Sequence, residues 1–195
     1  MNKFKAMDYI IDKEFEAIDY TTQPVEITEF ESCVFKNCNF SNMDLSEFRF
    51  LDSEFIECNL SNAMIHNTSF QNVNFLECKL LGLQFKNCDA FIFAIIAESC
   101  DLSHSSFYKM NLEKSSFKNS IMRAVDFEGA SLQKTRLEYC NLLNAKFEYT
   151  NLKKADLRGS TNYLIDPEIN ALKDARFSFP EVLNLMAKYE IQIDI

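Results

Sequence analysis

The chain has 195 residues, of which 47% are apolar, so it is long enough for one domain with a substantial core. It contains only three Gly, three Pro and no Trp, which disfavours a loop-rich β-sandwich because such folds need many Gly and Pro turns. The net charge of −9 disfavours direct nucleic-acid binding, which requires a basic surface.

Segments for membrane insertion or export are not evident in the sequence. No run of about 18 apolar residues occurs, so we expect no membrane span. Residues 1–12 mix charges with single apolar residues and lack a signal-peptide core, which favours a cytoplasmic protein. In that compartment the seven cysteines should be reduced thiols, and no CxxC pair indicates a zinc or redox site.

Residues 1–27 are expected to form an N-terminal cap. An apolar residue at every fifth position, clear from Phe30 onward, reaches back weakly through Phe15, Tyr20 and Val25. The segment is otherwise polar, and a polar cap would cover the unpaired strand edge at the start of a repetitive fold.

Residues 28–95 carry a five-residue repeat of apolar side chains. Thirteen of the fourteen positions hold a large side chain: Phe30, Phe35, Phe40, Leu45, Phe50, Phe55, Leu60, Ile65, Phe70, Phe75, Leu80, Phe85, Ala90 and Ile95. A small residue often stands two positions earlier, as at Cys38, Cys58 and Cys78. Residues 1–95 contain 15 acidic and 7 basic residues, a net charge of −8.

The repeat continues from Leu102 to Leu157, where all twelve positions are large and apolar, but its phase is shifted by two residues. We therefore predict a register break at 96–101. A bulged corner is the simpler interpretation, and a protrusion with a function is the alternative. Residues 96–160 contain 8 acidic and 10 basic residues, so the second half is weakly positive.

A period of five excludes the ordinary elements. On an α-helix, steps of about 500° would carry the apolar residues around the cylinder, and on a strand an odd period would alternate faces. The pattern predicts short extended sides whose small and large positions, two apart, both point inward. Four sides would close a coil, so residues 20 apart, such as Phe35, Phe55 and Phe75, should stack.

The repeat follows a residue pattern as well as a period. Residues 155–159 (ADLRG) and 38–42 (CNFSN) show a small residue, Asp or Asn, Leu or Phe, and two polar residues. Over residues 28–160 this pattern resembles that of the pentapeptide-repeat family. The resemblance implies an all-β fold, a right-handed quadrilateral β-helix, over residues 28–162.

Residues 163–195 change character and are expected to form a C-terminal cap. Pro180 suits the first turn of a short amphipathic helix, and alternating Ile191, Ile193 and Ile195 suggest a terminal strand. The apolar face of this helix is larger than one coil needs, so we also predict a homodimer through the C-terminus. The candidate contact residues are Val182, Leu183, Leu185, Met186 and Tyr189.

Groups for catalysis are scarce. The two histidines, His66 and His104, fall at outward positions in different halves, too few for a three-ligand metal site or a Ser-His-Asp arrangement. No Gly-rich phosphate loop occurs, and the carboxylates lie on convex faces that would not shift their pKa values. We predict no catalytic residue, cofactor or metal.

Two functions remain open. The first is a non-enzymatic scaffold for an unidentified protein partner, since a filled rod works through its outer surface. The second follows from the resemblance to the quinolone-resistance pentapeptide proteins, acidic dimeric rods that protect type II topoisomerases. It implies DNA mimicry toward DNA gyrase or topoisomerase IV, for which the candidate residues are Glu47, Asp52, Glu54 and Glu57. The positive second half and the lack of long loops depart from those proteins.

Overall fold

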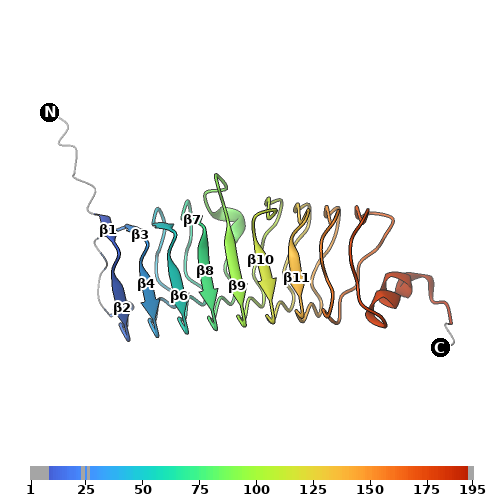
Figure 1. Ribbon diagram of the computed structural model, residues 1–195, viewed down its shortest axis with the longest axis horizontal. Helices are drawn as coiled ribbons and strands as arrows, with labels where there is room; N and C mark the ends of the chain where they lie inside the picture. The colour runs from blue at the N-terminus through green and yellow to red at the C-terminus, as the bar shows by residue number, and fades with distance from the viewer. Residues whose placement is uncertain (1–8, 23–24, 26, 193–195) are drawn as a thin grey trace.

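The computed structural model describes residues 9–22, 25 and 27–192. The chain winds into stacked coils that form an elongated rod, with the first and last coils at opposite ends (Figure 1). This confirms the predicted all-β class and the quadrilateral β-helix followed by a short C-terminal helix.

Two faces of the rod contain regular parallel sheets. The four-stranded sheet consists of β1 (Tyr9–Ile11), β3 (Glu29–Glu31), β5 (Arg49–Leu51) and β7 (Ser69–Gln71). The seven-stranded sheet consists of β2 (Glu14–Glu16), β4 (Val34–Lys36), β6 (Glu54–Ile56), β8 (Val73–Leu76), β9 (Ile95–Glu98), β10 (Ser116–Lys118) and β11 (Arg136–Glu138). The other two faces are held by single bridges, such as Asn39 to Asn59 and Ser106 to Asp126.

The polar positions of the repeat build the corners. The Asn39 and Asn59 side chains accept hydrogen bonds from the backbone N–H groups two residues later, at 3.1 and 3.0 Å, which closes a local turn. The corner residues then adopt a left-handed backbone, as at Asn37 (φ 51°) and Asn42 (φ 58°). Asn tolerates this region better than most residues, which explains why it recurs there.

The large inward side chains form continuous columns along the axis. Phe55 is fully buried, and its ring stacks on Phe35 at 4.7 Å and on Phe75 at 5.1 Å between centroids. Phe50 meets it edge-on at 5.2 Å from the adjacent side of the same coil. Each ring is therefore held by its own coil and by the coils above and below.

The predicted position of the register break is wrong. Val73 of β8 already pairs with Ile95, and Phe75 with Ala97, so the two extra residues precede β9 and lie within 89–94 rather than at 96–101. Ile95 thus occupies a small inward position and Ala97 a large one. The reason is that β8 and β9 pair without interruption, so the two extra residues must lie before β9. They enlarge the loop at residues 89–94, the projecting loop. The 3-10 helix η1 (Phe85–Asn87) precedes this loop, which projects beyond the neighbouring coils (Figure 1).

Both ends of the coil stack reach beyond the predicted boundaries. β1 and β2 pair with β3 and β4, so the expected N-terminal cap is itself a coil over its described residues. At the other end, Ala171 bridges to Asn151 and Arg176 to Asp156, well past residue 162. The final helix η2 (Glu181–Tyr189) is a 3-10 helix, and residues 191–192 form no strand. Residues 1–8, 23–24, 26 and 193–195 lie outside the described part of both predicted caps.

The small inward positions include every cysteine, and all seven are buried and free. In the column Cys38, Cys58, Cys78, the Cys58 sulfur accepts the backbone N–H of Cys38 at 3.4 Å and donates to the Phe35 carbonyl at 3.2 Å. A neutral thiol satisfies both contacts. Desolvation raises the pKa of Cys88 and raises that of Cys140 to about 11, which also favours the inert neutral form.

Replacing Phe55 by Ala should destabilise the fold by about 3–5 kcal/mol, because it opens a cavity between two stacked rings. Asn67→Ala is the control. Its side chain is exposed and donates only to Glu47, and Ala124 shows that Ala is accepted at a left-handed corner. Chemical denaturation should therefore show a loss of about 1 kcal/mol for the control. Equal losses for both variants would contradict the stacking of the core.

A thiol reagent should label few of the seven cysteines in the native protein and all seven after denaturation, because every thiol is buried. Mass spectrometry of the labelled protein gives the count directly. Rapid native labelling of Cys38, Cys58 or Cys78 would show that the small inward column is open to solvent.

Candidate interaction surfaces

The four acidic candidates do not share one face. Glu47, Asp52 and Glu57 occupy three successive corners, each with a left-handed backbone, and Glu54 lies on β6 between the last two. Neighbouring members of this set lie five residues or fewer apart in sequence, but the chain changes direction at each corner of the coil. The structure therefore distributes this charge around the rod rather than gathering it into one patch.

Neighbouring coils orient two of these carboxylates. The Asn67 amide donates to Glu47 at 2.9 Å, and the Asn72 amide donates to Asp52 at 2.7 Å. Both carboxylates remain exposed, as does Glu57, whereas Glu54 is half-buried. The acidic corners are thus held in place and open to a partner.

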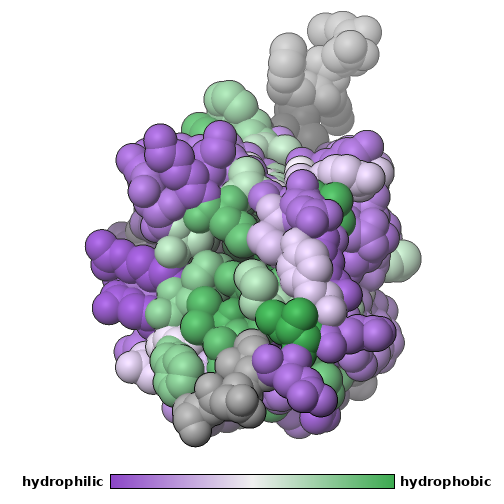
Figure 2. Space-filling view, turned by 90° about the vertical axis from the view of Figure 1, so that its right-hand side faces the viewer, coloured by the Kyte–Doolittle hydropathy of each residue, from purple (hydrophilic) through white to green (hydrophobic). Residues whose placement is uncertain are grey.

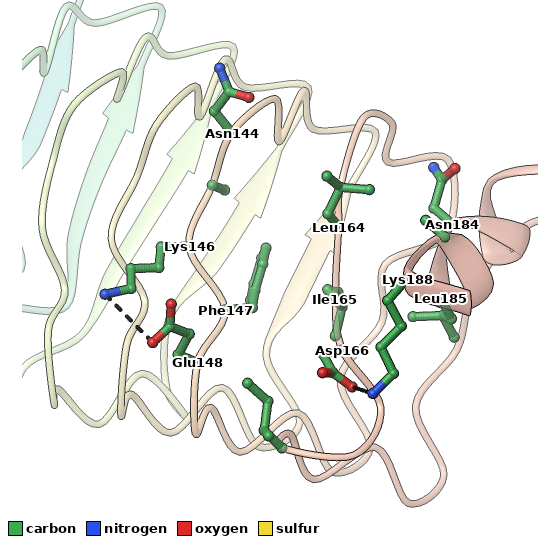
Figure 3. Close-up of a pocket in the computed structure, with 13 residues that line it drawn as sticks. Asn144, Lys146, Phe147, Glu148, Leu164, Ile165, Asp166, Asn184, Leu185 and Lys188 are labelled. Carbon is green, nitrogen blue, oxygen red and sulfur yellow. Dashed lines mark hydrogen bonds and ion pairs between the residues drawn. The ribbon is translucent and has the colours of Figure 1, made fainter. Parts of the chain in front are cut away.

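The C-terminal end carries a groove of about 760 Å³ between η2 and the last coils. Its walls include Phe147, Leu164 and Ile165 from the coils and Leu185 from the helix (Figure 3). Lys188 closes one side through a hydrogen bond of 2.6 Å to Asp166 and an ion pair of 2.7 Å with Glu168. Hydrogen bonding from Lys188 lowers the pKa of both carboxyl groups, so this contact is present at neutral pH and lost in acid as they protonate.

The five candidate dimer residues divide into two groups. Val182 and Leu183 are half-buried, and Leu185 packs against the core cluster. Met186 and Tyr189 are exposed, and the Tyr189 hydroxyl donates to Glu168 at 2.7 Å. Much of the apolar face of η2 is therefore packed against its own coil and is not available to a partner.

Three apolar residues outside the predicted set are more exposed in the C-terminal segment. Leu164, Phe179 and Ile191 are 64%, 66% and 56% exposed. Figure 2 shows an apolar patch in the middle of this end, surrounded by hydrophilic side chains. The sequence did not indicate Leu164, because it lies in a segment where the five-residue repeat is no longer visible.

A second apolar feature is the loop that contains the two extra residues. Phe91 is 73% exposed and Ile92 49% exposed, and Ile92 has a left-handed backbone (φ 59°). That conformation is strongly disfavoured for a β-branched residue. The only signal in the sequence was the apolar run from Phe91 to Ile95, which is longer than the repeat requires.

The described residues include no cluster typical of a metal site and no helix typical of a membrane span. His66 and His104 are exposed and lie on different parts of the coil. Within 9–22, 25 and 27–192, no group of three or more His, Cys, Asp or Glu side chains could hold a metal ion. None of the helices in these ranges is long and apolar enough to cross a bilayer.

Comparison with solved structures shows the same architecture elsewhere. A trypsin-treated variant of QnrB1, a plasmid-mediated fluoroquinolone resistance protein, has a TM-score of 0.72 at 19% identity and covers 96% of this chain and 92% of its own. Full-length QnrB1 has a TM-score of 0.55 at 19% identity, covering 94% and 100%. HetL, involved in heterocyst differentiation regulation in the cyanobacterium Nostoc sp. strain PCC 7120, has 0.59 at 15%, covering 87% of each chain. At these identities the likeness concerns the fold.

No curated protein matches the chain. The sequence profile of the family described as pentapeptide repeat region matches residues 28–91 and 96–162, which together make up more than half of the chain. The gap between the two matches overlaps residues 89–94. Across this segment, paired residues of successive coils are 22 positions apart in sequence, whereas they are 20 apart in the coil before it. With its repeat pattern and coil geometry in agreement, the chain belongs to the pentapeptide-repeat family.

Proposed function

We propose that the protein is a non-catalytic scaffold that binds a protein partner. The observation that carries this proposal is the filled axis, in which stacked Phe and Leu side chains leave the outer surface as the place for binding. On that surface, exposed apolar side chains gather at one end of the rod and exposed carboxylates at several corners. Apolar residues rimmed by polar ones are typical of protein interfaces.

The apolar end supports self-association through the C-terminus. A β-helix ends in an open coil, and here Leu164, Phe179 and Ile191 add exposed apolar area around the groove beside η2. A two-fold axis at this end would use the same patch twice and close the assembly. The product is an end-to-end dimer with the acidic halves at its far tips.

In about 1 M salt, where contacts between exposed charges are screened, light scattering on the intact chain should give a mass near twice 22.7 kDa. Leu164→Glu should return the mass toward 22.7 kDa, because a charge would be buried in the apolar end. Ile121→Glu is the matched control. Its side chain is 43% exposed on a long face away from the end, so the mass should not change. A monomer for the intact chain at micromolar concentration would refute end-to-end association.

A second candidate function is DNA mimicry toward a type II topoisomerase, DNA gyrase or topoisomerase IV. It is supported by the exposed carboxylates at Glu47, Asp52 and Glu57 and by the likeness in fold to QnrB1, a fluoroquinolone resistance protein. Acidic groups on a rod can compete for a surface that binds phosphates. The carboxylates on three corners would contact a groove that encloses the rod.

A gyrase supercoiling assay with and without a quinolone tests this second candidate. If the acidic corners act, the protein should change supercoiling or its inhibition, and Glu47→Lys with Glu57→Lys should reduce the effect at least about tenfold, since like charges would then face the site. Glu113→Lys, an exposed reversal in the second half, is the control. If the protein has no effect on gyrase with or without the quinolone, mimicry toward gyrase is refuted and the scaffold must bind another protein partner.

A further inference from the structure

One corner of the rod has a charge pattern that changes sign along its length. It joins the four-stranded face to the seven-stranded face, and we call it the bipolar edge. Its corner residues are Asp12, Ser32, Asp52 and Asn72 in the first half and Lys114, Lys134, Lys154 and Asp174 in the second. The strand and bridge registers place these residues one above another, because they precede strands or bridged residues that pair in sequence from β2 to Arg176.

The first half of the bipolar edge is acidic. Asp12, Glu31, Asp52 and Glu54 lie on or beside it, and none forms an ion pair with another described residue. Two bases also lie near this half. Lys13 follows Asp12, and Arg49 is already engaged by Glu29 at 3.9 Å. The free charge of this half is therefore negative.

The second half of the bipolar edge is basic. Its exposed cations are Lys114, Lys134, Arg136, Lys153, Lys154 and Lys173, and within the described residues none of them forms an ion pair. Three acids lie nearby. Asp156 is buried and engaged by Arg158 at 2.6 Å, which leaves Glu113 and Asp174 as the opposing exposed charges. Seen along the edge, the sign changes from negative to positive.

The sign changes at the projecting loop. Four layers of the four-stranded face, β1, β3, β5 and β7, precede residues 89–94. Four bridged layers follow on the same face, at Asn111, Ser131, Asn151 and Ala171. The loop is thus the midpoint of the described stack and presents Phe91 and Ile92 to solvent. A hollow of about 610 Å³ is lined by these two side chains and by polar residues of the neighbouring coils, among them Glu47, Arg49 and Asn67.

We propose that the bipolar edge binds a second copy of this chain, side by side and antiparallel, with the two-fold axis at the projecting loop. Around this axis, a coil that lies a given number of layers before the loop in one copy faces the coil that lies the same number of layers after the loop in the other copy. Asp52 and Glu54, two layers before, then meet Lys134 and Arg136, two layers after. Glu31 meets the layer of Lys153 and Lys154. Asp12 meets the layer of Lys173 and Asp174, where the charges are mixed.

The contact is self-complementary, as an isologous interface must be. The layers of Glu31 and of Asp52 with Glu54 in one copy meet basic layers of the other, and each pairing occurs twice. At the axis, the exposed Phe91 and Ile92 of one copy face those of the other, so that both apolar pairs can be buried. A parallel arrangement would instead place acid against acid and base against base.

This side-by-side contact is distinct from the end-to-end contact proposed above. Its axis lies at the middle of the rod instead of at the C-terminal end, so the two can be tested separately. Ala90→Cys provides the probe. Ala90 is exposed beside the axis and the seven native thiols are buried, so a short bismaleimide should join two copies through residue 90 alone. The end-to-end contact leaves the two copies of residue 90 far apart.

In full-length Ala90→Cys protein carrying Leu164→Glu to block the end, we expect cross-linked dimer at twice 22.7 kDa. Raising the salt from about 0.1 M to about 1 M shortens the Debye length from about 10 Å to about 3 Å and should reduce the yield several-fold. Two charge variants then test the pairing: Asp52→Lys with Glu54→Lys, and Lys134→Glu with Arg136→Glu. Lys134 has φ 63° and Glu57 φ 53°, so such corners accept both Lys and Glu.

Each charge variant alone should lose cross-linking by about tenfold or more, since like charges would face each other. An equal mixture of the two should recover it as a mixed dimer, because residues 52 and 54 of each variant then face residues 134 and 136 of opposite sign in the other. Circular dichroism should show an unchanged fold in all samples. The proposal is overturned if Ala90→Cys gives no dimer, if the separate variants cross-link as well as the parent, or if the mixture fails to recover.

Discussion

Each inward side chain is stabilised by its counterpart in the next coil, and the rod cannot form without this stacking. Because coils lie about 4.8 Å apart, a large inward residue can be buried only if the same position above and below is also filled. Phe35, Phe55 and Phe75 satisfy this requirement with centroid separations of 4.7 and 5.1 Å. Loss of one ring would leave a void shared by three coils, so stability is held cooperatively along the axis.

The same constraint controls where irregularity can occur. Two extra residues cannot be accommodated in a side of the coil without breaking the column or the sheet. They are therefore expelled at 89–94, where the chain leaves one face before β9 restores pairing with β8 at a spacing of 22. The result is an exposed Phe91 and a strained Ile92 at the middle of the rod.

The binding surfaces of such a molecule depend on which outward residues the 20-residue coil brings together. Residues five apart lie on different corners, whereas residues 20 apart lie one above another, so charges close in sequence become separated and distant charges become neighbours. Glu47, Asp52 and Glu57 illustrate the first effect. Lys134 and Lys154 illustrate the second, with Lys134 donating its backbone N–H to Lys153 in the next coil at 3.0 Å. The bipolar edge is a product of this rearrangement.

The repeat, the coil of four sides, the inward Phe and Cys columns and the short final helix all follow from the sequence, because strict period-five patterning permits one stacking geometry. The ends of the stack were not located in this way, because the apolar period weakens there. Phe15 and Tyr20 do continue the columns, stacking on Phe35 and Phe40, but the coil that they belong to becomes evident only from the pairing of β1 and β2. At the other end, the coil around Ala171 is evident from its bridge to Asn151. The register break was misplaced because Ile95 is apolar enough for either inward position, and only pairing with Val73 distinguishes them. The sequence also does not show which outward residues share a surface. Residues 20 apart lie one above another within each half, but residues 22 apart do so across the break.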